Sequence, residues 1–193
     1  RTIAEFARLL GRDASAYDAA ADDVARGFER FWSAEHGYLY DVVDGPEGYD
    51  PALRPNPLIA LALPHRLVDE ARARSIVAAC ARHLWASVGL RSLAPHDPEY
   101  IGDYGGDLET RDGAYHQGTA WGWLIGPFIM AYADVHGPTA ARALLEPFDD
   151  HLSDAGIGSV SEIFDGNAPW TPRGCPWQAW SVAEVLRCWR ALA

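Results

Sequence analysis

Apolar residues recur every three to four positions along most of the chain, which is the spacing of one face of an α-helix. The pattern predicts about seven helices, with glycine or proline at most of their boundaries. Their ranges are 2–10, 15–36, 56–63, 68–87, 121–135, 139–152 and 177–192. Alternation of the kind that marks a strand never extends beyond a few residues. The sequence therefore predicts an all-α fold.

The same periodicity predicts which helix faces are buried. The helix over 121–135 is apolar on most sides, so it should lie in the interior. Ser15 and Thr119 are expected to cap the helices that follow them. The predicted inward positions of three other helices are Tyr17, Ala21, Val24, Phe28, Phe31 and Trp32; Leu144, Leu145, Phe148 and Leu152; and Val182, Leu186 and Trp189.

Long and short loops alternate between the predicted helices. The long loops, 35–54, 89–118 and 153–176, are polar and aromatic, whereas the breaks at 64–66 and 137–138 are short. A string of antiparallel helices with this alternation describes helical hairpins arranged in a ring, and the long-loop end should carry the site. Seven helices are too few to close a ring of six hairpins. The expected fold is therefore the C-terminal portion of an (α/α)6 toroid, with the barrel incomplete.

Composition agrees with one domain over residues 1–193, since the chain is long enough for a core and 49% of it is apolar. The formal net charge of −11 disfavours nucleic acid and anionic membranes as partners. Neutral sugars are not disfavoured by this charge. Eight tryptophans are many for this length, and carbohydrate sites use tryptophan rings as stacking platforms.

Cysteine usage indicates a reducing compartment. Cys80, Cys175 and Cys188 are odd in number and far apart, which argues against a disulfide framework and predicts a cytoplasmic protein. No CxxC or HExxH motif occurs, so no metal site is expected. The longest apolar run, 121–133, is too short to span a bilayer. The chain begins with Arg1 inside a predicted helix, which suggests a piece of a longer protein.

The stretch from Gly113 to Phe128 stands out as a candidate site. Its first half is polar and interrupted by glycine, and it carries Tyr115, His116 and Gln117; its second half is almost wholly apolar. Aromatic faces with a few amide and imidazole donors can hold a polar, flat-faced ligand. A sugar fits that description, as do other ligands. A buried histidine with satisfied hydrogen bonds is the alternative interpretation of His116.

Glu162 is the candidate catalytic residue, because a carboxylate in a loop before Ile163 and Phe164 could act as a general base on water. Glycoside hydrolysis needs two carboxyl groups across the scissile bond, one acid and one base. The second could come from the acidic loop 103–112, for which a solvated loop is the alternative interpretation. Glu162 itself could instead cap a turn. Cys175 has no base nearby in the sequence, so it is not expected to be a nucleophile.

Other polar residues fall at loop ends on the presumed site face. Such side chains could bind sugar hydroxyls, although surface ion pairs and turns would use the same residue types. These residues are Arg54, Asn56, Arg91, His96 and Asp97, together with Gln178, Trp180 and Ser181 at the start of the last helix.

Five stretches resemble, in order and spacing, the C-terminal, amylo-α-1,6-glucosidase domain of glycogen debranching enzymes. They are 54–57 (RPNP), 89–93 (GLRSL), 112–121 (DGAYHQGTAW), 161–166 (SEIFDG) and 172–181 (PRGCPWQAWS). The resemblance implies an (α/α)6 barrel that hydrolyses α-1,6-linked glucose at branch points of glycogen, or of a branched α-glucan oligosaccharide, with inversion and without a cofactor. It puts Glu162 at the position of the catalytic base. The residues it puts in stretches that line the sugar pocket are Arg54, Asn56, Arg91, Asp97, His116, Gln117, Trp121, Gln178 and Trp180.

The chain departs from the family pattern in one respect. The general acid of the family is an aspartate in a Thr-Trp-Met-Asp type motif, and this sequence has no such motif. The acid is therefore expected in a missing upstream segment or from another residue. A partial barrel should also expose an apolar flank, which would promote self-association.

Two other functions remain open from the sequence. The chain could be a non-catalytic carbohydrate-binding or regulatory fragment, which would bind sugar without turnover. It could also be a helical-barrel sugar epimerase that uses His96 and His116 as an acid and base pair. The epimerase interpretation leaves Glu162 and its surrounding motif unexplained.

Overall fold

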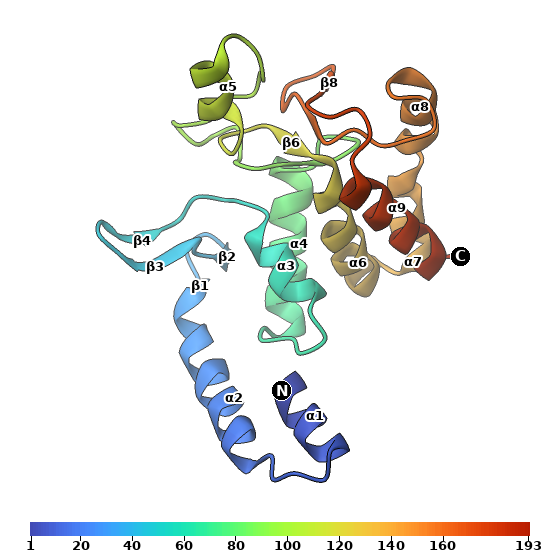
Figure 1. Cartoon of the computed structure of the whole chain (residues 1–193). Coiled ribbons are helices and arrows are strands. Elements are labelled where there is room, and N and C mark those ends of the chain that lie inside the picture. The colour runs from blue at the N-terminus through green and yellow to red at the C-terminus, as the bar shows by residue number, and fades with distance from the viewer.

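The computed structural model describes residues 1–193, and most of its regular structure is helical (Figure 1). No helix is long and apolar enough to cross a membrane. Three short 3₁₀ helices, η1 to η3, cover Glu29–Phe31, Gly122–Leu124 and Ala143–Leu145. The α-helices are α1 Thr2–Leu9, α2 Ser15–Phe28, α3 Asn56–Ala62, α4 Glu70–His83, α5 Leu108–Ala114, α6 Ile125–His136, α7 Pro138–Arg142, α8 Pro147–Asp154 and α9 Ala179–Ala191.

Each of the seven predicted helical ranges contains a helix, and the structure has nine α-helices in all. One extra helix arises because the predicted range 139–152 is divided: Pro147 lacks an N–H to continue the preceding helix, and it begins α8. The other is α5, which lies inside the predicted loop 89–118. Asp107 caps α5, since its carboxylate accepts from the Thr110 backbone N–H, and this bond holds the pKa of Asp107 below its ordinary value.

Short strands join the long loops, and the periodicity did not predict them. Strands β5 Leu90–Arg91, β6 Ala120–Trp121, β7 Ile163–Phe164 and β8 Pro172–Arg173 form an antiparallel sheet in that order. The sheet lies at one end of the helices, above α4 and α6 in Figure 1. The hairpin of β3 Val42–Gly45 with β4 Gly48–Asp50 lies in the first long loop. The hairpin of β1 Trp32–Ser33 with β2 Tyr38–Leu39 begins inside the predicted helix 15–36, because α2 ends at Phe28 and η1 follows it. Loops 89–118 and 153–176 therefore meet, as the sequence predicted.

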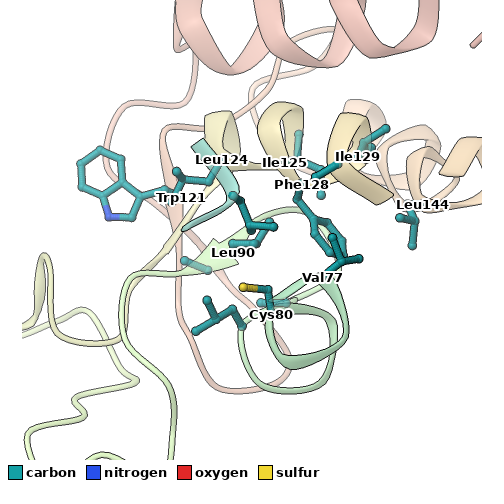
Figure 2. Close-up of a cluster of buried hydrophobic side chains, with 14 of the residues drawn as sticks. Val77, Cys80, Leu90, Trp121, Leu124, Ile125, Phe128, Ile129 and Leu144 are labelled. Atoms are coloured by element: carbon teal, nitrogen blue, oxygen red, sulfur yellow. The ribbon is translucent and has the colours of Figure 1, made fainter. Parts of the chain in front are cut away.

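Helix α6 is the centre of the core and packs against α3, α4, α7 and α9. Figure 2 shows Phe128 of α6 beside Val77 of α4, with Ile125 and Ile129 along the same helix. The prediction that this apolar helix is buried is confirmed. Its contact with α9 is close: a Cβ atom at Gly126 would lie 2.9 Å from the Glu184 Cβ, so glycine is needed at this crossing.

Several predicted caps and inward faces were wrong. In α2 no residue is buried; Tyr17 and Val24 are 46% and 60% exposed, and only Phe28, Phe31 and Trp32 at its end and beyond reach the core. The predicted positions Leu152, Leu186 and Trp189 are also exposed. In α9, Ser181 and Cys188 are the buried residues. Ser15 donates to the Asp13 carboxylate through its N–H and hydroxyl rather than capping α2, and the Thr119 hydroxyl donates to the Ala114 carbonyl.

The hairpin of α1 and α2 stands apart from the main core. Figure 1 shows it extending away from the other helices, and its buried residues form a separate cluster of Ala4, Ala7 and Ala14. Large apolar side chains on this hairpin are open to solvent: Ile3, Phe6, Leu9, Leu10, Tyr17 and Val24. Periodicity identified an apolar face, but nothing in residues 1–193 covers it.

Candidate active site

A cavity of about 340 Å³ opens where the first turns of α3 and α9 meet strand β6 and η2. Five of the residues that line it are hydrophobic, and none carries a carboxyl group. Two were predicted from the long loops, His116 and Arg54, and three more from the starts of predicted helices, Asn56, Trp121 and Trp180. The remaining lining residues are Pro55, Ile59, Ser92, Trp123 and Leu124.

The aromatic rings of this cavity form a continuous wall. The His116 and Trp121 rings are stacked, with centroids 5.2 Å apart and planes within 5° of each other. Trp180 meets Trp121 edge-on at 6.1 Å and stacks on Trp123 at 5.5 Å. Trp121 extends away from the other core side chains drawn in Figure 2. Trp121 is 5% exposed and Trp180 is 47% exposed, so Trp180 presents the larger aromatic surface, which suits the apolar face of a sugar ring.

Arg54 organises the loop that carries His116. Its guanidinium donates to the His116 carbonyl at 2.7 Å, to the Ser92 carbonyl at 3.1 Å and to the Gln117 Oε1 at 2.7 Å. Asp41 lies 3.6 Å from the Arg54 Nε and accepts from the Asn56 amide at 2.5 Å. A planar guanidinium can serve several acceptors at once, so this side chain joins the long loops 35–54 and 89–118 at the rim of the cavity.

Glu162 is held by backbone and side-chain contacts immediately before β7. Its N–H donates to the Cys175 carbonyl and its own carbonyl accepts from the Gly122 N–H, so the residue is fixed between two neighbouring chain segments. The half-buried carboxylate accepts from the Tyr115 hydroxyl at 2.7 Å through Oε1 and from the Cys175 N–H at 2.9 Å through Oε2. A hydrogen-bonded carboxylate has the chemistry of a general base.

His151 supports the segment that carries Glu162. Its ring is buried, lies 5.0 Å from the Phe164 ring, and accepts from the Ser161 N–H through Nε2 at 3.1 Å. Burial lowers the pKa of His151, so the imidazole stays neutral and can act as an acceptor. The residue therefore fixes the backbone one position before Glu162.

Asp165 and Arg91 fix the C-terminal end of the stretch 161–166, which carries Glu162. Asp165 is 5% exposed, pairs with Arg173 at 2.9 Å and accepts from the Tyr104 N–H at 2.8 Å. The ion pair between this buried carboxylate and the exposed Arg173 was not predicted from the sequence. Arg91 donates to the carbonyls of Gly166, Trp85 and His83 at 2.7, 2.9 and 3.2 Å.

Four of the predicted binding residues do not line the cavity. Arg91 donates to backbone carbonyls. The Gln117 side chain lies between two partners: its Oε1 accepts from Arg54, and its amide N–H donates to the Glu99 carboxylate at 2.9 Å. Asp97 accepts from the Glu99 N–H at 2.9 Å, and Gln178 is the N-terminal cap residue of α9. Their roles toward a substrate stay predictions.

The histidine pair of the epimerase interpretation is not assembled in one cavity. His116 lies in the cavity wall, whereas His96 packs edge-on against His83 with centroids 5.0 Å apart. The structure has no group of three or more histidine, cysteine, aspartate or glutamate side chains arranged to hold a metal ion. Cys80 and Cys188 are buried and Cys175 is exposed; none forms a disulfide.

Solved structures identify the class of fold. The chain superposes on the GH63 mannosylglycerate hydrolase from Thermus thermophilus with a TM-score of 0.67 and 21% identity, over 97% of this chain and 41% of that one. Neutral trehalase from Saccharomyces cerevisiae gives a TM-score of 0.65 and 14% identity, over 94% of this chain and 33% of that one. The chain thus holds part of the (α/α)6 barrel of such glycoside hydrolases, as the sequence predicted.

Sequence comparison identifies the family. The sequence model of the amylo-alpha-1,6-glucosidase family matches residues 1–187, so the chain belongs to this family of glycoside hydrolases. The glycogen debranching enzyme of Saccharomyces cerevisiae is 34% identical over 113 residues, which cover 55% of this chain and 7% of that protein. The chain therefore spans a small part of this curated relative and about two fifths of the solved mannosylglycerate hydrolase. The predicted family is confirmed.

Proposed function

We propose that residues 1–193 form one domain, the base-bearing part of a glucosidase that removes α-1,6-linked glucose from branched α-glucans with inversion. The observation that carries the proposal is the Glu162 carboxylate, hydrogen-bonded on both oxygens and connected through Tyr115 to the aromatic cavity. Membership of the amylo-alpha-1,6-glucosidase family supports the choice of linkage. The proposed substrate is glycogen or a branched α-glucan oligosaccharide.

In this mechanism the terminal glucose enters the cavity and lies against Trp121 or Trp180. Glu162 takes a proton from a water molecule while the water oxygen attacks the anomeric carbon from the face opposite the leaving group. The bond to the glycosidic oxygen breaks, and that oxygen receives a proton from the general acid. Inversion leaves β-glucose. The negative carboxylate also favours the positive charge that develops on the sugar ring.

The general acid is proposed to come from outside residues 1–193. No carboxyl group is among the residues that line the cavity, and Glu162 reaches it only through Tyr115. Asp41 at the rim is bound to Arg54 and Asn56, and Asp107 in the acidic loop is occupied as the cap of α5. An inverting pair needs its two carboxyl groups about 6.5–9.5 Å apart, with room for water between them. An acid on a further part of the barrel could meet this requirement across the cavity.

The test uses α-D-glucosyl fluoride, because fluoride leaves as an anion and needs no proton from a general acid. The purified chain is expected to hydrolyse it, with β-glucose as the first anomer observed by proton NMR. Release of α-glucose, or no release above the buffer rate, would overturn the proposal. Binding of glucose without turnover of the fluoride would instead support a carbohydrate-binding fragment.

A second set of substrates tests the specificity for the α-1,6 linkage and the location of the general acid. An α-1,6-glucosylated oligosaccharide is expected to stay intact with this chain and to be hydrolysed once the acid is supplied by a longer protein. Hydrolysis by the chain itself would mean that the acid lies within it, and loop 103–112 is then the first place to look. Trehalose and mannosylglycerate serve as comparison substrates, since the structural neighbours act on compounds of those names.

We also propose that the isolated chain self-associates through the exposed apolar face of α1 and α2. Phe6 and Leu9 on this face are 60% and 80% exposed, and exposed apolar patches commonly mark interaction surfaces. Sedimentation velocity is expected to show a dimer or larger species that grows with concentration. Double substitution of Phe6 and Leu9 by glutamate should return the chain to a monomer. A monomer at all concentrations for the unmodified chain would contradict this proposal.

A further inference from the structure

Tyr115 connects the aromatic wall of the cavity to Glu162. The sequence placed it in the candidate site stretch 113–128, and the family resemblance gave it no role. It follows α5 as the C-terminal cap residue. Its hydroxyl donates to Glu162 Oε1 at 2.7 Å, while its backbone carbonyl accepts from the Trp121 indole N–H at 3.0 Å. Its ring centroid lies 4.6 Å from that of Trp121 and 5.0 Å from that of His116. One residue thus contacts both the carboxylate and the stacked rings.

We propose that Tyr115 is a positioning residue that fixes the Glu162 carboxylate relative to the Trp121 ring, and so relative to the anomeric carbon of a bound sugar. The inference rests on the proposed function and extends it. Tyr115 acts through Glu162 and Trp121, and it need not touch the substrate. Its role is to keep the distance between the Trp121 ring and the Glu162 carboxylate constant when the surrounding loops move.

The chemistry of the contact suits this role. Burial and the adjacent Glu162 carboxylate raise the pKa of Tyr115, so the phenol keeps its proton and always donates. The terminal torsion of a glutamate side chain has a broad range of allowed values, and a carboxylate with a single donor can turn. Donors on both oxygens, Tyr115 on Oε1 and the Cys175 N–H on Oε2, remove that freedom. Each oxygen keeps acceptor capacity for water.

The contacts around Tyr115 hold its backbone in place, as the positioning of Glu162 requires. Ala114 is fully buried, and its carbonyl accepts from the buried Thr119 hydroxyl at 2.9 Å, which closes the turn between α5 and β6. Gly118, within that turn, has φ of +142° and packs against Ile101, where a Cβ would lie 2.8 Å from the Ile101 carbonyl carbon. Supporting contacts of this kind preorganise a site.

The experiment compares Tyr115→Phe with the unmodified chain on α-D-glucosyl fluoride. Phenylalanine keeps the ring contacts and the backbone carbonyl that holds Trp121, and it removes only the bond to Glu162. We expect kcat to fall roughly 10- to 100-fold, as for loss of a hydrogen bond to a charged group, with KM changed by less than about twofold.

Tyr104→Phe is the matched control, since the Tyr104 ring packs 5.7 Å from Tyr115 while the Glu162 oxygens are bonded by other groups. It should keep the kcat and the KM of the unmodified chain. An unchanged kcat in Tyr115→Phe would overturn the inference, as would a rise in KM alone. A failure of the proposed function gives a distinct result, because the unmodified chain itself would then be inactive on α-D-glucosyl fluoride.

Discussion

Substituting Glu162 with glutamine is expected to lower kcat on α-D-glucosyl fluoride by about 10²–10⁴-fold, the usual contribution of a general base. The amide cannot take a proton from water. The change should otherwise be mild: the Gln Oε1 can accept from the Cys175 N–H, and the Gln amide can donate to the Tyr115 hydroxyl, which is both donor and acceptor. The loss therefore reports proton transfer rather than a disturbed fold.

The control is Glu146→Gln, which removes one carboxylate from an exposed position before α8. It should keep the rate of the unmodified chain and show that net charge alone is not responsible. Circular dichroism and the melting temperature of Glu162→Gln should match those of the unmodified chain. If Glu162→Gln turns over the fluoride at the original rate, Glu162 is not the base.

The sequence predicted helices well because burial repeats along them over several turns. Helix α6 is the best example, since its apolar character on most sides corresponds to contacts with four other helices. Periodicity says less about which apolar face is covered. Tyr17 on α2 and Leu186 on α9 have the correct spacing and remain exposed, because their burial would require neighbours that residues 1–193 do not provide.

The candidate site was predictable only in part. Motifs located the cavity wall, because His116, Trp121 and Trp180 carry distinctive side chains at loop ends. They did not reveal the sheet, since strands of two residues are too short to show alternation. Contacts across long sequence separations were also hidden, such as Tyr115 with Glu162 and Arg91 with the Gly166 carbonyl.

The role of Gly174 could not be predicted from sequence either, and it leads to the second large effect. Gly174 has φ of +65°, and a Cβ added there would lie 2.6 Å from Glu162 Oε2 and 2.9 Å from the Ile163 Cγ1. Ile163 is fully buried and cannot retreat easily, whereas the Glu162 carboxylate is at the end of a flexible chain. Alanine at 174 should therefore displace the carboxylate from the Cys175 N–H.

We expect Gly174→Ala to lower kcat on α-D-glucosyl fluoride by roughly 10²-fold, since a misplaced catalytic group commonly costs that much. The free energy of unfolding should fall by about 1–2 kcal/mol, the cost of a Cβ in left-handed backbone, and further through the contact with buried Ile163. Gly158→Ala separates the two effects: Gly158 has φ of +81° in the same loop, but a Cβ there meets nothing within 4 Å. That variant should lose only the stability due to left-handed backbone, measured by urea denaturation, and keep its kcat. Equal kcat values for the two variants would mean that the 172–175 segment does not place the base, whereas a loss confined to Gly174→Ala would tie catalysis to the position of one carboxylate oxygen.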